Sequence, residues 1–137
     1  MARRTQVKSH RGIYVASKIK HAPTWRMLRS NGIPIISSWI DEAEVGQTED
    51  FADLWTRCID EASHAGALIA YMEDGEVFKG AFIEIGAALA SKVPVYVVCS
   101  SSITLSFQKH PLVTTCAISG GSNPIRAALM QIEEARK

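Results

Sequence analysis

The stretch 80–88, GAFIEIGAA, decides the fold because it lies between two apolar segments that have the composition of buried strands. Residues 67–71 (ALIAY) and 93–98 (VPVYVV) are short and rich in aliphatic and β-branched side chains, as strands of a parallel sheet are. The stretch itself predicts a helix with a broad apolar surface and one carboxylate, Glu84, in its first turn. The helix dipole favours a carboxylate there, and no cation lies four residues further on. Glu84 is therefore either a partner of the dipole or a working carboxylate.

The same alternation of strand-like and helix-like segments runs through the rest of the chain. We expect further strands over residues 12–16, 33–37 and 113–118, and further helices over about 23–32, 48–63 and 124–135. A strand, a helix and a second strand within the first 37 residues imply a right-handed crossover. The sequence therefore predicts a three-layer α/β sandwich, flavodoxin-like or Rossmann-like, with a four- or five-stranded, mostly parallel sheet.

Length and charge suggest one domain without a nucleic-acid partner. The 137 residues fit a single domain over residues 12–137, preceded by a basic, apolar-poor segment, residues 1–11, that we expect to be a flexible tail. A net charge of +1 gives no basic field of the kind that nucleic-acid binders carry. No apolar run approaches the length of about 20 residues that a membrane span needs, so we expect no membrane association.

The cysteines and histidines give no sign of a metal or a disulfide framework. Cys58, Cys99 and Cys116 are odd in number and show no CxxC spacing, which favours a reducing, cytoplasmic location. The histidines His21, His64 and His110 lack partners at metal-ligand spacing. The chain also has neither a glycine-rich dinucleotide fingerprint nor a Walker lysine motif, so we expect no metal and no cofactor.

Polar side chains follow several of the predicted strands, at the edge where open parallel sheets bind ligands. Ser17 and Lys18 follow the first strand and Trp39 follows the second; Lys79 and Gly80 precede Glu84, and Ser100 follows residues 93–98. Hydroxyls, a lysine, an indole and a carboxylate suit a sugar or nucleotide better than an apolar ligand. Each residue also has a structural alternative: Ser17 in a turn, Trp39 in the core and Lys79 in solvent. Trp25 and Trp55 have the spacing of core or oligomer contacts.

Residues 13–17, 69–70, 80–88 and 93–97 together resemble the nucleoside 2-deoxyribosyltransferase family and its relatives, the deoxynucleoside-monophosphate glycosidases. In that family a Gly-x-x-x-Glu-x-Gly-x-Ala pattern carries the catalytic glutamate, which the resemblance maps onto Glu84. It implies double displacement at the anomeric carbon of a nucleoside or nucleotide, with the sugar held as an ester and then collected by a second base or water. It also implies a homo-oligomer, dimeric or higher, because in the family a neighbouring subunit completes the pocket.

The resemblance and the sheet edge together give a set of candidate site residues. Glu84 is the expected nucleophile. Asp41 is our first choice for the acid that protonates the leaving base, because it follows Trp39, where a base could stack. Substrate binding is assigned to seven residues: Tyr14, Ser17, Lys18, Trp39, Lys79, Gly80 and Ser100.

Two differences from the family pattern leave the activity open. The family has Asp-Ser-Gly before the glutamate where this chain has Phe78-Lys79-Gly80, and Gly66 stands where members often have an aspartate. Lys79 near a helix N-terminus would favour a phosphate. These differences leave nucleotide hydrolysis, another ribosyl donor, or binding without turnover. The main hypothesis is a glutamate-dependent N-glycosidase or glycosyltransferase, the alternative is an inactive nucleotide-binding module of the same fold, and a weaker third is a plain flavodoxin-like interaction domain.

Overall fold

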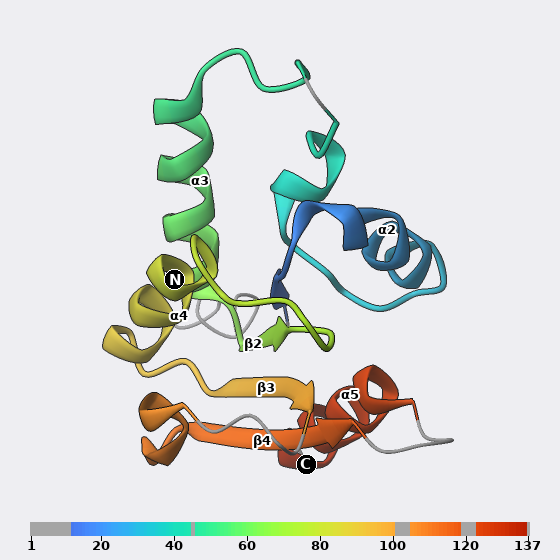
Figure 1. Cartoon of the computed structure of the whole chain (residues 1–137), viewed down its shortest axis with the longest axis vertical. Coiled ribbons are helices and arrows are strands. Elements are labelled where there is room, and N and C mark those ends of the chain that lie inside the picture. Colours follow the sequence, from blue (N-terminus) through green and yellow to red (C-terminus); the bar gives the residue numbers. More distant parts are fainter. Residues whose placement is uncertain (1–11, 45, 101–104, 119–122, 137) are drawn as a thin grey trace, which may run out of the picture.

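The computed structural model describes residues 12–44, 46–100, 105–118 and 123–136 (Figure 1). The predicted tail, residues 1–11, lies outside the described residues. The strands are β1 (Ile13–Ala16), β2 (Ala67–Tyr71), β3 (Val95–Ser100) and β4 (Val113–Ile118). The α-helices are α2 (Ala22–Ser30), α3 (Phe51–His64), α4 (Ala81–Ala90) and α5 (Pro124–Ala135), and the 3-10 turns are η1 (Ile19–His21), η2 (Ser38–Asp41) and η3 (Ser106–Lys109).

The four strands form one parallel sheet in the order β1-β2-β3-β4. Ile13 lies opposite Ala67, Leu68 opposite Val95, and Val95 opposite Val113. Helices α3 and α4 lie on one side of the strands and α2 and α5 on the other (Figure 1). The predicted three-layer α/β architecture is confirmed, with four strands in the sheet.

Capping residues set where two of the helices begin. The side chain of Asp50 accepts a hydrogen bond from the backbone N–H of Asp53 at 3.1 Å, and Asn123 does the same for Arg126 at 3.1 Å. Each oxygen satisfies one of the backbone donors that a helix start leaves unpaired. Gly32 follows the end of α2 with φ +99°, a conformation that glycine adopts without strain.

The strand predicted over residues 33–37 is reduced to a single bridge, between Ile35 and Ile13. Beyond that bridge, side chains rather than backbone groups form hydrogen bonds with β1. The hydroxyl of Ser37 accepts a hydrogen bond from the N–H of Val15 at 2.7 Å, and the indole N–H of Trp39 donates one to the carbonyl of Val15 at 2.8 Å. The outer edge of β1 is therefore satisfied without a fifth strand, and the chain turns away into η2.

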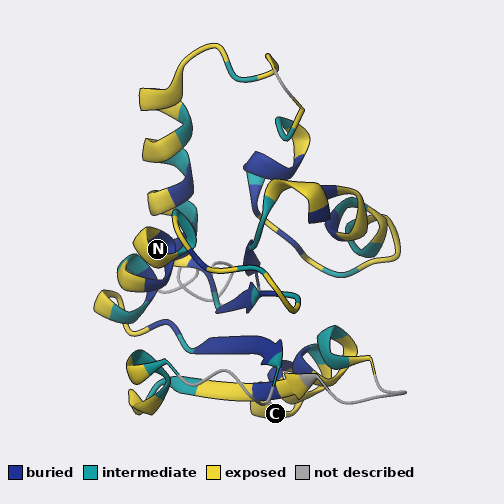
Figure 2. Cartoon of the chain, in the orientation of Figure 1, coloured by how far each residue is buried: buried dark blue, intermediate teal, exposed yellow. Residues whose placement is uncertain are grey.

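The core lies along β1, β2 and β3. Every residue of β1 is buried, and β3 is buried except for Ser100, whereas β4 is exposed over much of its length as an edge strand (Figure 2). The fully buried side chains include Trp25, which was predicted as a core or oligomer contact and is a core residue. No described helix has both the length and the apolar character needed to cross a membrane.

The strand order determines where the sheet can bind a ligand. The chain passes from β1 outward to the bridge at Ile35 and then returns to the other side of β1 to form β2. This reversal makes a topological switch point between β1 and β2, and open α/β sheets bind ligands outside the carboxyl ends of the strands at such a point. Ser17 and Met72 are the residues that follow these two strands.

Ser37→Ala should destabilise the protein, because it removes the buried hydroxyl that pairs with the backbone N–H of Val15. We expect the free energy of unfolding in urea to fall by about 1–3 kcal/mol, the cost of an unsatisfied buried donor. Thr56→Ala is the matched control, because the Thr56 hydroxyl bonds only to the backbone of its own exposed helix turn among the described contacts; it should change stability by less than about 0.5 kcal/mol. Equal losses in the two variants would show that Ser37 does not hold the edge of β1.

Candidate functional site

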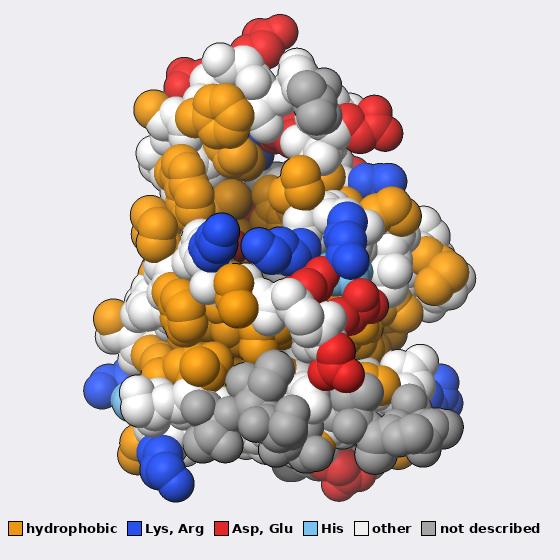
Figure 3. All heavy atoms as spheres, in the orientation of Figure 1, with side chains coloured by type: hydrophobic (Ala, Val, Ile, Leu, Met, Phe, Trp, Pro, Cys, Tyr) orange, Lys and Arg blue, Asp and Glu red, His pale blue; other side chains and the backbone are white. Residues whose placement is uncertain are grey.

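A cavity of about 470 Å³ opens at the carboxyl ends of β1 and β2. Its walls come from the residues after β1, from η2, from α3, from the loop that follows β2 and from the start of α4. Figure 3 shows a hollow lined with hydrophobic side chains, with basic side chains along its lower edge. The volume is that of a pocket for a small molecule, and its place is the switch point of the sheet.

Glu84 lies in the wall of this cavity and is only 8% exposed. It is the fourth residue of α4, on the helix face that also buries Ile85 and Ala88. The hydroxyl of Tyr14, on β1 and fully buried, donates a hydrogen bond to Oε2 of Glu84. Tyr14 was predicted as a substrate-binding residue; in the structure it contacts the predicted nucleophile.

The surroundings of Glu84 oppose its ionisation. Burial raises the pKa of Glu84 to about 7, an effect to which the charge of Glu61 adds and which the hydrogen bond from Tyr14 partly offsets. Tyr14 itself stays protonated, because burial and the Glu84 charge place its pKa far above the ordinary value for tyrosine. Cys58, beside them in the cavity wall, also stays a thiol at neutral pH, since burial raises its pKa to about 11. Glu84 is thus poised to change charge near neutral pH.

Two lysines, Lys18 and Lys79, line the cavity. Within the described part of the chain, no ion pair or hydrogen bond involves the ammonium of Lys18 or of Lys79. Gly80, which precedes α4, lies in the same wall, so the positive end of that helix adds to the two ammonium groups. Ser17 also lines the cavity, where its hydroxyl accepts from the indole N–H of Trp25 at 2.8 Å. This part of the cavity favours an anionic group.

The rest of the cavity lining is largely aromatic and aliphatic. Trp39, Trp55 and Phe78 line it together with Leu54 and Cys58. Trp55, predicted as a core or oligomer contact, packs against Gly80 so closely that a Cβ there would lie 3.1 Å from its ring. Phe78, which stands where the resembled family has an aspartate, is buried and packs edge-to-face on Phe82. These surfaces suit a flat, weakly polar group such as a nucleobase.

Three of the predicted site residues do not line the cavity: Tyr14, which contacts the cavity residue Glu84 from behind the wall, Asp41 and Ser100. Asp41 does not line it; its carboxylate pairs with the guanidinium of Arg29 at 2.8 and 3.0 Å. The hydrogen bond from Arg29 holds the pKa of Asp41 below its ordinary value, which makes Asp41 a poor proton donor. The position of Asp41 shortly after Trp39 had suggested that it faces the ligand. Contacts between η2 and α2 instead set the direction of the turn, and the sequence alone does not reveal them. Ser100 ends β3 and is not among the residues that line the cavity.

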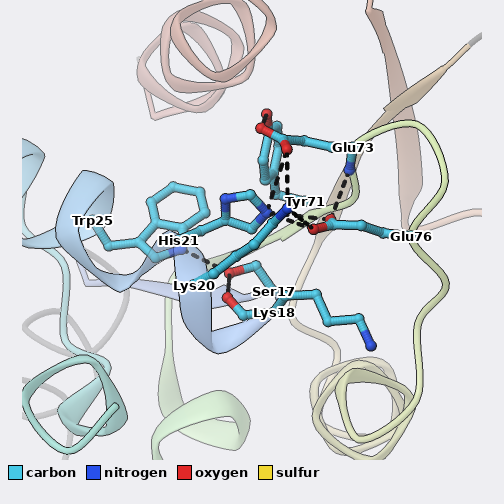
Figure 4. Close-up of polar contacts among 8 residues, drawn as sticks. All are labelled: Ser17, Lys18, Lys20, His21, Trp25, Tyr71, Glu73 and Glu76. Atoms are coloured by element: carbon cyan, nitrogen blue, oxygen red, sulfur yellow. Dashed lines mark hydrogen bonds and ion pairs between the residues drawn. The ribbon is translucent and has the colours of Figure 1, made fainter. Parts of the chain in front are cut away.

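A polar cluster that the sequence analysis missed lies beside the cavity (Figure 4). Atoms of His21, Glu73 and Glu76 that could bind a metal lie within 4.8 Å of one another. The ammonium of Lys20 lies 3.3 Å from Glu76 and 3.8 Å from Glu73, so the same carboxylates already have a cationic partner. Spacing along the chain could not reveal the cluster, because His21 precedes the two glutamates by more than fifty residues.

Glu84→Gln should stabilise the protein at high pH and not at low pH. The pKa of Glu84 is about 7 in the folded protein, above the 4.5 of an unperturbed glutamate, so its contribution to stability is complete below about pH 4.5 and is lost as the pH rises through 7. At pH 8 the variant should therefore be more stable than wild type by up to about 3 kcal/mol, with the difference vanishing near pH 4. Urea denaturation between pH 4 and 8 measures this, with the exposed Glu49→Gln as control. A difference that does not vary with pH would contradict the raised pKa.

No protein-family model matches this chain, and no curated protein matches it at a significant level of sequence similarity. The site is therefore interpreted from its own geometry: a buried carboxylate with a tyrosine partner, an aromatic wall and two lysines, gathered at the switch point of a parallel sheet.

Proposed function

We propose that the protein cleaves the N-glycosidic bond of a nucleoside or nucleotide, as an N-glycosidase or glycosyltransferase, with Glu84 as nucleophile. The observation that carries the proposal is the buried Glu84 carboxylate, oriented by Tyr14 in the wall of a cavity whose other walls are aromatic and cationic. Such a cavity offers a place for each part of a nucleotide: the base against Trp39 or Trp55, the sugar at Glu84, and a phosphate near the lysines.

The proposed reaction has two displacements at C1′ of the sugar. In the first, an oxygen of Glu84 forms a bond to C1′ while the C1′–N bond breaks, and the electron pair leaves with the base, which takes up a proton from solvent water. In the second, water or another base attacks C1′ and gives up its proton to solvent, while the bond between C1′ and the Glu84 oxygen breaks and releases the carboxylate. Both transition states carry positive charge on the sugar, which a fixed anion stabilises.

The environment of Glu84 fits the role of a nucleophile provided that the carboxylate is ionised. A nucleophilic carboxylate must be ionised, and a pKa of about 7 makes the ionised fraction rise steeply across neutral pH. The Tyr14 hydroxyl holds one oxygen of the carboxylate, which fixes the direction of the other. The rate of the first displacement should therefore increase with pH up to about 8.

Lys18 and Lys79 support a phosphorylated substrate over a free nucleoside. Both line the cavity, and within the described residues neither ammonium has an anionic partner in the free protein. The start of α4 adds its dipole in the same region, and backbone N–H groups at a helix start bind phosphate well. A nucleoside 5′-monophosphate is therefore the favoured substrate class.

Release of free base is the direct test of the proposed reaction. Wild-type protein and Glu84→Ala are incubated with nucleosides, ribonucleotides, deoxyribonucleotides and nicotinamide dinucleotide, with and without an acceptor base, and free base is measured by chromatography. We expect wild type to release base from at least one donor, and Glu84→Ala to lose at least about a thousandfold in rate, a loss typical of removing a nucleophile. Glu73→Gln, close to the cavity but outside its wall, should keep wild-type activity.

The same experiment separates the proposed function from its alternatives. Dependence of the rate on the acceptor base distinguishes transfer from hydrolysis. A nucleotide that raises the melting temperature without any release of base would favour an inactive binding module, an alternative that the buried Phe78 supports because it offers no carboxylate to the sugar. If no donor gives either release of base or a thermal shift, the interaction domain is the hypothesis that remains.

Lys18→Ala and Lys79→Ala should weaken binding of a nucleotide more than binding of its nucleoside. Each ammonium is expected to contribute about threefold to tenfold in the dissociation constant for the phosphorylated ligand, with a smaller effect at high salt. Calorimetric titration of the nucleotide and nucleoside at two salt concentrations measures this. Lys109→Ala, in η3 and outside the cavity, is the control. Equal effects on both ligands would argue against a phosphate at the lysines.

A further inference from the structure

Glu76 is a second carboxylate in the cavity wall, held by four contacts in the loop between β2 and α4. The backbone N–H of Glu73 donates to its Oε1 at 2.9 Å, and the imidazole of His21 lies 3.2 and 3.0 Å from its two oxygens. The ammonium of Lys20 lies 3.3 Å from Oε2. Figure 4 shows these groups converging on the Glu76 carboxylate. Its side chain is only 10% exposed, so the carboxylate has one well-defined position.

The charge state of Glu76 differs from that of Glu84. Burial raises the pKa of Glu76, but the hydrogen bonds from the Glu73 backbone, His21 and Lys20 outweigh burial and hold it below the ordinary value. Glu76 is therefore ionised at neutral pH, where Glu84 is only partly so. Two carboxylates in one cavity with pKa values that differ in this way are suited to different roles.

Glu76 still has room to accept a hydrogen bond from a ligand. A carboxylate has about four acceptor positions, and the Glu73 N–H, the His21 Nε2 and the Lys20 ammonium are three donors. Among the described side chains that line the cavity, Glu76 and Glu84 are the two carboxylates, and Phe78, which lies between them in the sequence, offers no acceptor. A ligand hydroxyl in this part of the cavity therefore finds its charged acceptor in Glu76.

We propose that Glu76 determines specificity for the sugar, by accepting a hydrogen bond from a 2′- or 3′-hydroxyl of the nucleotide whose C1′ faces Glu84. The inference rests on the proposed function, because it takes the ligand to be a nucleotide with its sugar next to Glu84. Glu73 is a natural control, since it shares the contacts with Lys20 and His21 and also accepts from the Tyr71 hydroxyl, but does not line the cavity. A hydrogen bond to a charged acceptor discriminates well against a ligand that lacks the donor.

Binding to the Glu84→Gln protein tests the inference without turnover. The probes are 5′-monophosphates of adenine, guanine, cytosine and uracil, each with ribose, 2′-deoxyribose, 3′-deoxyribose and 2′,3′-dideoxyribose, titrated by calorimetry. For the best-bound base, a hydroxylated sugar should bind about tenfold more tightly than the dideoxy sugar. Adding Glu76→Gln should reduce that ratio to about twofold and leave dideoxy binding unchanged, whereas adding Glu73→Gln should leave the ratio intact. Glu76→Asp keeps the carboxylate but shortens the side chain by one methylene, so it should also reduce the ratio of hydroxylated to dideoxy binding. It replaces Glu76→Gln in the test if that variant does not fold.

Several results would overturn the inference, and they differ from those that overturn the function. A ratio near one in the parent protein, a uniform loss of binding for all sugars in Glu76→Gln, or the same fall in ratio in Glu73→Gln would each show that Glu76 only supports its loop. Sugar-dependent binding that needs Glu76, together with no release of base by wild type, would refute the proposed catalysis and keep the role of Glu76. Absence of binding by all the nucleotides would refute the role of Glu76, whereas the proposed reaction is refuted only if wild type releases no base from any donor.

Discussion

The hydrogen bond from Tyr14 to Glu84 is the interaction on which the site depends, because it joins the sheet to helix α4 at the cavity wall. Tyr14 comes from β1 and Glu84 from the first turn of α4, and both side chains are buried. A buried carboxylate without a donor would be strongly destabilising. The tyrosine therefore makes a buried Glu84 tolerable while leaving its second oxygen available to the cavity.

The topology explains why this pair is accessible to a ligand at all. In a doubly wound sheet the connections leave β1 and β2 in opposite directions, so no crossover covers the gap between their carboxyl ends. The single bridge at Ile35 is enough to define that reversal. Ser37 and Trp39 then satisfy the edge of β1 with their side chains, and the same turn delivers the ring of Trp39 to the cavity. One short segment thus completes the fold and builds a wall of the site.

The sequence predicted the fold well because its strands are apolar runs with clear boundaries, and the structure confirms the parallel α/β architecture. It also predicted several residues that line the cavity, among them Ser17, Lys18, Trp39, Lys79 and Glu84, because the carboxyl ends of parallel strands lie together. Asp41 could not be placed from the sequence, since its ion pair with Arg29 depends on how η2 packs on α2. Trp55 and Glu76 were not predicted as cavity residues, because the contact of Trp55 with Gly80 and that of Glu76 with His21 are long-range and leave no local sequence pattern.

The two cavity carboxylates differ because their neighbours differ, and this has a consequence for how a nucleotide would bind. Glu84 has a neutral donor and a nearby carboxylate, so placing negative charge on it is costly; Glu76 has a lysine, a histidine and a backbone N–H, so its charge is balanced. A bound phosphate would add negative charge to the cavity and oppose ionisation of Glu84 still further. Lys18 and Lys79 lie in the wall where they can offset that charge. The lysines would then serve the chemistry as well as the binding, because without them a phosphorylated ligand would hold Glu84 in its protonated, unreactive form.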